Sequence, residues 1–171
     1  MTARLTGKVA AITGGGGGIG SAAGEIFCRE GAQVALIDAS QEAVDKAAKS
    51  ILSLMPGAKV YGFVADLGIE SEADRVVRDV VAKLGGLDVL VNNVGIRRYE
   101  AIADAPWETW DAIVRVNLLS FVSMTRAALP HLRKSQKGSI INTSSTYAVY
   151  GRKGMGAYLS LIHISEPTRR S

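Results

Sequence analysis

A run of glycines, Gly14–Gly18, directly follows a short apolar segment and constrains the fold more than any other feature. The apolar residues Val9–Ile12 are typical of a buried strand, and an amphipathic helix pattern begins near Ser21. A strand that turns into a helix through glycines presents unpaired backbone N–H groups and the positive end of the helix dipole, which together bind a pyrophosphate. Glycine leaves room for that phosphate. A flexible linker is the alternative, but it fits poorly between a strand and a helix.

The composition is that of one globular domain. The chain has 171 residues, of which 47% are apolar and 21% charged, so it can bury a core. Its net charge is +4, and its basic residues are scattered in pairs, which does not favour nucleic-acid binding. The sequence contains no apolar run of about 18 residues, as a membrane helix needs. The single cysteine, Cys28, cannot form an internal disulfide. We expect a cytoplasmic protein that binds neither nucleic acid nor membrane and has no metal site.

Short apolar segments alternate with helical patterns along the whole chain, which predicts an α/β fold with a Rossmann-type, doubly wound parallel sheet in the order 3-2-1-4-5. Parallel strands are covered on both faces and therefore have continuous apolar runs. The expected strands are Val9–Thr13, Gln33–Asp38, Lys59–Ala65, Asp88–Asn92 and Ser139–Thr143. The expected helices are Ser21–Glu30, Gln41–Leu54, Ser71–Leu84 and Pro106–Lys134, and Pro130 is expected to bend or interrupt the last one.

Polar residues follow successive strands of this predicted sheet. Asp38 lies 18 residues after Gly20, close to the spacing at which an acid binds the adenosine ribose hydroxyls. Its carboxylate would repel a 2′-phosphate, so NAD is favoured over NADP; a surface aspartate at a strand end is the alternative. Asp66 follows the third strand and the turn Asn92–Gly95 follows the fourth. In isolation each is ordinary turn chemistry, but in this order they point to one crevice.

Several ordered motifs from Thr6 to Tyr158 together resemble the short-chain dehydrogenase/reductase family. Thr13, Gly14, Gly18 and Gly20 fit its T-G-x-x-x-G-x-G pattern, whereas Gly15, Gly17 and Gly20 fit only the general G-x-G-x-x-G pattern. The turn after the fourth strand has Val94 where the family usually has alanine. The resemblance implies an NAD-dependent oxidoreductase that acts on a secondary alcohol or ketone. The implied cofactor contacts are Gly14, Gly16, Gly17, Gly18, Ile19, Gly20, Asp38, Asp66, Leu67, Asn92, Val94 and Gly95.

The resemblance also implies a reaction centre made of Asn117, Ser145 and Tyr158. Tyr158 lies thirteen residues after Ser145, and this spacing selects Ser145 rather than Ser144. Tyr158 would transfer a proton to or from the substrate oxygen, Ser145 would hold that oxygen, and Asn117 would support a water that relays protons. Hydride transfer creates or consumes an alkoxide, which needs such groups.

The chain departs from the family four residues after the tyrosine, where Ile162 replaces the family's lysine. His163 is no substitute, because it lies about 100° further round a helix. A free tyrosine has a pKa near 10, so about one molecule in a thousand would be phenolate at neutral pH without a cationic neighbour. Both the charge and the donor to the nicotinamide ribose are missing.

The residues from Leu159 onward resemble the translation of a sequencing-library adapter; a divergent natural tail is the alternative. We therefore expect residues 1–158 to be a truncated dinucleotide-binding domain and residues 159–171 a non-native tail. The sheet would then be incomplete at its C-terminal edge, and this fragment would be inactive. The resemblance implies that the parent is a homodimer or homotetramer. A non-catalytic NAD-binding protein, such as a sensor or pseudoenzyme, is the other reading.

Three further features of the sequence are weaker indications of function. Arg97 and Arg98 could bind an acidic substrate, although a solvated loop pair is the simpler interpretation. Trp107 and Trp110, three residues apart, are expected to pack, and His131 has no partners for a metal site.

Overall fold

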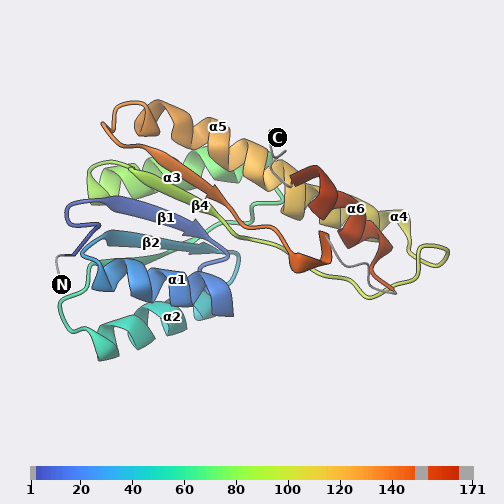
Figure 1. Ribbon diagram of the computed structural model, residues 1–171, viewed down its shortest axis with the longest axis horizontal. Coiled ribbons are helices and arrows are strands. Elements are labelled where there is room, and N and C mark those ends of the chain that lie inside the picture. The colour runs from blue at the N-terminus through green and yellow to red at the C-terminus, as the bar shows by residue number, and fades with distance from the viewer. Residues whose placement is uncertain (1–2, 149–153, 166–171) are drawn as a thin grey trace.

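Five parallel strands form one sheet in the order β3-β2-β1-β4-β5 in a computed structural model that describes residues 3–148 and 154–165. The predicted fold class and strand order are therefore confirmed. In chain order the strands are β1 (Val9–Thr13), β2 (Gln33–Asp38), β3 (Val60–Val64), β4 (Val89–Asn92) and β5 (Ser139–Asn142). Their carboxyl ends lie at one edge of the sheet, with helices α4 (Trp107–Val114) and α6 (Gly156–Ser165) beyond that edge (Figure 1).

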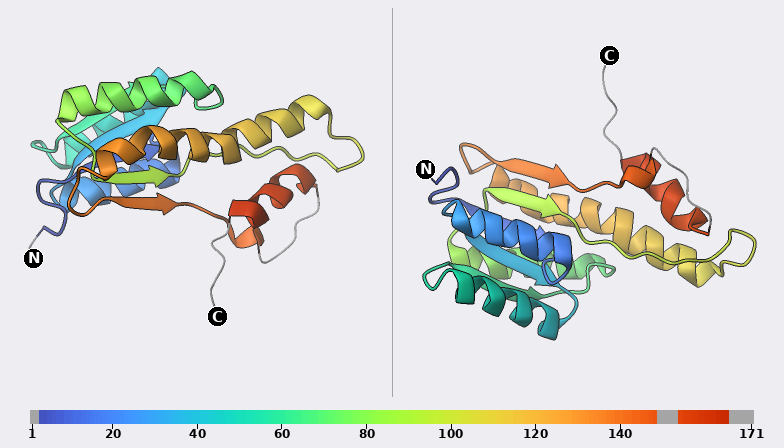
Figure 2. Two further views of the ribbon diagram at one scale, coloured as in Figure 1. Left: turned by 90° about the horizontal axis from the view of Figure 1, so that it is seen from above. Right: turned by 60° about the horizontal axis from the view of Figure 1, so that its bottom comes forward.

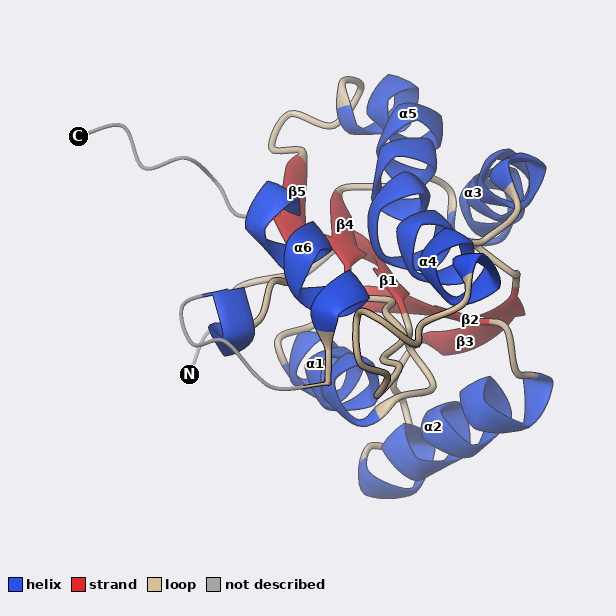
Figure 3. Cartoon of the chain, turned by 90° about the vertical axis from the view of Figure 1, so that its right-hand side faces the viewer, coloured by secondary structure: helices blue, strands red, loops and turns tan. Residues whose placement is uncertain are grey.

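Two pairs of helices cover the sheet (Figure 3). Alternate strand residues such as Ala11 and Ile37 pack against α3 (Glu70–Leu84) and α5 (Ser120–Leu132), whereas Ile12 and Leu36 face α1 (Gly18–Arg29) and α2 (Gln41–Leu54). Because side chains alternate along a strand, continuous apolar runs supply both cores. Helix α2 begins where Ser40 accepts a hydrogen bond from the backbone N–H of Ala43, as an N-cap does.

The long helical region after β4 begins with α4 (Trp107–Val114) and continues through a π-helical turn, Arg115–Leu119, into α5. Pro130 does not interrupt α5, which continues to Leu132. The irregularity lies at the π turn instead, and sequence reasoning did not predict it. By length and composition alone the span Trp107–Leu132 could cross a membrane. Its inward residues Met124, Ala128 and Leu132 are buried in the core, so we interpret it as a core helix.

Strand β5 lies at the edge of the sheet, and no strand pairs with its outer side among the described residues (Figure 2). All four of its residues are exposed, including Ile140 at 37% and Ile141 at 44%. Adjacent residues of a strand face opposite sides of the sheet, so apolar surface is exposed on both faces there. Helix α6 (Gly156–Ser165) packs beside α4, where Ala157 and Leu161 form a small core with Ile113.

Candidate active site

The loop between β1 and α1 requires glycine for its own folding, as Gly14 and Gly20 show. Gly14 has φ +64°, a conformation that other residues rarely adopt. A Cβ on Gly20 would lie 2.2 Å from the carbonyl oxygen of Gly14. Backbone hydrogen bonds fix the loop, because the N–H of Gly15 donates to the carbonyl of Ile37 and the N–H of Gly17 donates to that of Gly14.

Gly18 has a different role, since a Cβ placed on it would meet nothing within 4 Å. Helix α1 begins at Gly18, and no side chain caps its N-terminal N–H groups. These groups border a cavity of about 560 Å³ lined by Gly14, Gly17, Gly18, Ile19, Gly20, Asp38, Asp66, Leu67, Asn93, Val94, Gly95 and Arg97, among others. Open space beside uncapped amides at the positive end of a helix fits a pyrophosphate.

Asp38 and Gly16 are hydrogen-bonded to each other at one side of this cavity. The backbone N–H of Gly16 donates to Oδ2 of Asp38 across 3.1 Å, and the N–H of Ser40 donates to Oδ1 across 3.3 Å. Gly16 does not line the cavity, and its missing side chain makes room for Ala43, because a Cβ there would lie 2.5 Å from that of Ala43. Gly16 therefore positions Asp38 instead of facing the cavity itself.

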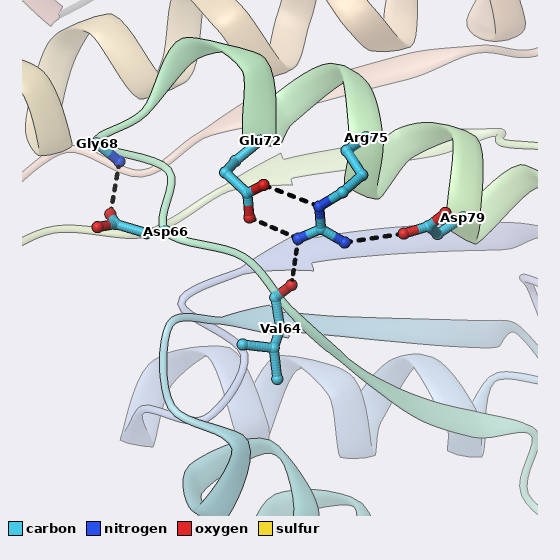
Figure 4. A network of polar contacts seen from close by, with 6 residues as sticks. All are labelled: Val64, Asp66, Gly68, Glu72, Arg75 and Asp79. Atoms are coloured by element: carbon cyan, nitrogen blue, oxygen red, sulfur yellow. Dashed lines mark hydrogen bonds and ion pairs between the residues drawn. The ribbon is translucent and has the colours of Figure 1, made fainter.

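The carboxyl end of β3 is held by Arg75 on α3 (Figure 4). The Arg75 guanidinium donates to the carbonyl of Val64 across 2.7 Å and also pairs with Glu72 and Asp79. Hydrogen bonds from Arg75 hold the pKa of the Glu72 carboxyl below its ordinary value. Two residues after Val64, Asp66 turns the chain by accepting the N–H of Gly68 at 2.9 Å. Arg75 thus fixes the strand end that presents Asp66 and Leu67 to the cavity.

Thr13 joins the glycine loop to the turn after β4. Its hydroxyl oxygen accepts the backbone N–H groups of Asn93 at 2.9 Å and Val94 at 3.0 Å, and the Asn93 side chain donates to the Thr13 carbonyl. Asn92 differs from expectation, because its side chain is fully buried in the sheet, where it donates to Asn142. Its position is structural, and Asn93, which sequence reasoning did not select, lines the cavity instead.

Asn117 lies within the π-helical turn and binds the backbone of Ile96 through both ends of its amide. Its Nδ2 donates to the Ile96 carbonyl at 2.9 Å, and its Oδ1 accepts the Ile96 N–H at 2.8 Å. Both polar atoms of the Asn117 side chain are therefore already hydrogen-bonded to the backbone, whereas it was expected to support a water. The π turn changes the helical hydrogen-bonding pattern at Asn117, a feature often found at functional sites.

The three residues expected to form the reaction centre come together. Asn117, Ser145 and Tyr158 line one cavity of about 250 Å³, although they come from the π turn, the segment after β5 and α6. The hydroxyl oxygen of Ser145 accepts the backbone N–H of Tyr147 at 3.2 Å, so its proton is available to another acceptor. Ile162 and His163 follow on α6, but their side chains lie outside the described residues.

The two cavities share a wall, which consists of Ile19, Asn93, Val94, Gly95 and Arg97. A ligand in the larger cavity could therefore reach the one that contains Ser145 and Tyr158. This continuity is the geometry that transfer between a bound nucleotide and a second small molecule requires.

The remaining residues that could have a functional role lie outside the two cavities. Trp110 packs in the α4–α6 core as expected, but Trp107 is 83% exposed. Cys28 is half-buried on α1, and burial raises the pKa of its thiol to about 11, which makes it a poor nucleophile at neutral pH. Among the described residues no group of three or more His, Cys, Asp or Glu could hold a metal ion.

The chain is similar to short-chain dehydrogenases in both sequence and structure. A model of the short chain dehydrogenase family matches residues 8–160. A 3-oxoacyl-acyl-carrier-protein reductase of Thermotoga maritima is 41% identical over 155 residues, which cover 91% of this chain and 62% of that protein. D-beta-hydroxybutyrate dehydrogenase of Cupriavidus necator is 35% identical, with 93% of this chain and 61% of that protein covered. The chain thus spans about three fifths of the length of these curated relatives.

Solved structures agree with the sequence relatives. A short chain dehydrogenase from Mycobacterium smegmatis superposes with a TM-score of 0.88 and 30% identity, covering 94% of this chain and 68% of that one. An NAD+-bound xylitol dehydrogenase superposes with a TM-score of 0.87 and 29% identity, covering 94% of this chain and 61% of that one.

Proposed function

Because this chain belongs to the short-chain dehydrogenase family, we propose that the whole protein is an NAD-dependent oxidoreductase acting on a secondary alcohol or ketone. The observation that supports this proposal is the wall shared by the two cavities, because one cavity is lined by Ser145 and Tyr158 and the other has a lining that suits a dinucleotide. When bound there, a nicotinamide supplies the hydride chemistry.

The chain's own residues supply binding and proton transfer. The N–H groups at the start of α1 bind the pyrophosphate, and Asp38 accepts hydrogen bonds from the adenosine ribose. In the reducing direction Ser145 donates a hydrogen bond to the substrate oxygen, and the Tyr158 hydroxyl gives that oxygen its proton. Asn117 holds the Ile96 backbone, which supports the turn between the two cavities.

Preference for NAD over NADP is part of the proposal. The Asp38 carboxylate lines the cavity, and Asp66 adds a second negative charge to the same lining. With Arg97 counted, the charged residues of this lining still sum to −1, which disfavours a 2′-phosphate. We also assign the protein to the cytoplasm and expect it to form a homodimer or homotetramer.

Ile162 is the observation that favours a second function. The chain has isoleucine where the family's lysine would promote proton loss from the tyrosine, so the 171-residue chain is proposed to be inactive. If residues 159–171 are natural, the protein is instead a non-catalytic NAD-binding protein. Reading the source DNA beyond the Tyr158 codon distinguishes the two, since an adapter sequence there removes the argument for a pseudoenzyme.

Nucleotide binding is tested with a matched pair of glycine variants. A side chain at Gly18 would enter the cavity, whereas Gly86 lies outside its lining, and a Cβ at either position meets nothing within 4 Å. Isothermal titration with NADH should show binding by the unaltered chain and by Gly86→Leu, and loss of binding by Gly18→Leu. Equal NADH affinity in both variants would refute the proposed site.

A further inference from the structure

Arg97 occupies the wall between the two cavities and lines both of them. It lies in the loop after β4, two residues beyond Gly95, and is exposed. Within residues 3–148 and 154–165 its guanidinium forms neither an ion pair nor a hydrogen bond. An arginine is charged at all ordinary pH values and presents five donors in a planar fork.

The cavity that contains Ser145 and Tyr158 has no other charged group in its described lining. Its remaining side chains are apolar, amide or hydroxyl groups, among them those of Asn117, Ser145 and Tyr158. No carboxylate lies among them, and the two that share a lining with Arg97, Asp38 and Asp66, belong to the larger cavity. A positive charge in an otherwise neutral cavity favours an anionic ligand, and a guanidinium binds a carboxylate or phosphate through two parallel hydrogen bonds.

Arg98 is arranged differently although it is the next residue. Its Nη1 donates to the backbone carbonyl of Arg97 at 3.2 Å, and it lines neither cavity. The sequence presents the two arginines as a pair, but the structure separates them. Arg98 therefore serves as a control of equal charge in the same loop.

We infer that Arg97 binds an anionic group of the substrate, so that the substrates are hydroxy acids and oxo acids or similar anions. This inference rests on the proposed function, because it concerns the same reaction cavity. The cofactor's pyrophosphate is a second source of the same chemistry. We assign Arg97 to the substrate because the uncapped start of α1 already provides the phosphate site.

Ligand-observed NMR on the NADH-loaded chain tests this assignment. The probes are pyruvate, acetoacetate and laevulinate, each compared with its neutral methyl ester, so that charge changes while the ketone remains. The unaltered chain should bind at least one oxo acid about tenfold more tightly than its ester, as expected for a charged hydrogen bond. Arg97→Gln should abolish that preference, Arg98→Gln should keep it, and both should retain the NADH affinity.

The other outcomes separate this inference from the proposed function. Equal binding of acid and ester, no binding of any probe, or equal effects of Arg97→Gln and Arg98→Gln would overturn the inference. A loss of NADH affinity in Arg97→Gln alone would also overturn it, because Arg97 would then hold the cofactor's phosphate. Failure of the unaltered chain to bind NADH would remove the proposed function and this inference together.

Discussion

The carboxylate of Asp38 accepts the backbone N–H of Gly16, with 3.1 Å between Oδ2 and the nitrogen. This bond joins the end of β2 to the glycine loop, and Asp38 also lines the nucleotide cavity. The residue proposed to select the cofactor therefore also supports the loop. A substitution that removes both oxygens changes loop stability and cofactor choice together, so the two effects must be separated by the choice of variant.

Asp38→Asn combined with Ala39→Arg should shift cofactor preference from NADH toward NADPH by about tenfold or more, because repulsion is removed and a phosphate partner is added. Asparagine keeps an oxygen for the Gly16 N–H, so the loop should remain formed. Fluorescence titration with both dinucleotides measures the ratio of dissociation constants, and Ala39→Arg alone is the control. Tighter or equal binding of NADPH by the unaltered chain would refute the NAD assignment.

Arg75→Ala should weaken NADH binding roughly fivefold, because it releases the Val64 carbonyl and with it the segment that carries Asp66. Lysine should not rescue the loss, since it cannot form the paired contacts of a guanidinium. Arg78→Ala, on the same helix and without an ion pair in the described part of the chain, is the control. If Arg75→Ala lowers the melting temperature but leaves NADH affinity unchanged, Arg75 is structural only.

Much of the fold could be predicted because continuous apolar runs between turn residues specify buried parallel strands. The strands Val9–Thr13 and Gln33–Asp38 were predicted with the bounds that the structure has. The π turn at Arg115–Leu119 was not, since its residues continue an ordinary helical pattern. Its stabilising contact, between Asn117 and Ile96, joins positions 21 residues apart. The local sequence pattern does not predict a contact between positions so far apart.

The residues of the candidate site were also predictable only in part. The residues that follow strands, such as Asp38 and Asp66, could be placed in one crevice because parallel strands end at one edge. Asn92 and Asn93 could not be distinguished, since alternation along a strand sends one side chain into the sheet and leaves the next at its edge. The sequence also could not predict which of Arg97 and Arg98 faces a cavity, because side chains in a loop follow no fixed periodicity.

Asp88 should make stability depend on pH. It is partly buried, which would raise the pKa of its carboxyl, but hydrogen bonds from Ser135, the Val9 N–H and Lys8 outweigh this and hold the pKa below the ordinary 3.8. A carboxyl whose pKa is lowered by folding stabilises the protein above its unfolded pKa and loses this effect as pH falls through the folded value.

Asp88→Asn should therefore lower the free energy of unfolding by about 1 kcal/mol near neutral pH, and the difference should shrink below about pH 4. Urea denaturation across this pH range measures it, with the exposed Asp104→Asn as the control. A difference between the unaltered chain and Asp88→Asn that stays constant with pH would show that its charge is not involved.

The 171-residue chain should not oxidise or reduce any alcohol or ketone at a meaningful rate. Tyr158 and Ser145 line one cavity, but Ile162 brings neither a charge for the tyrosine nor a donor for the nicotinamide ribose. General acid–base catalysis typically contributes about 10²–10⁴-fold, and most of that should be absent. Ile162→Lys alone should rescue little, because β5 remains an exposed edge and the chain spans about three fifths of its relatives.

If residues 159–171 are a non-native tail, replacing them with a family-like continuation that has lysine at position 162 should recover activity. NADH absorbance assays should compare the chain as it stands, its Ile162→Lys variant and the restored chain, against hydroxy acids and neutral secondary alcohols. Binding of NADH by all three is the control that each is folded. Clear turnover by the unaltered chain would contradict both the inactivity proposed for it and the role given to the missing lysine.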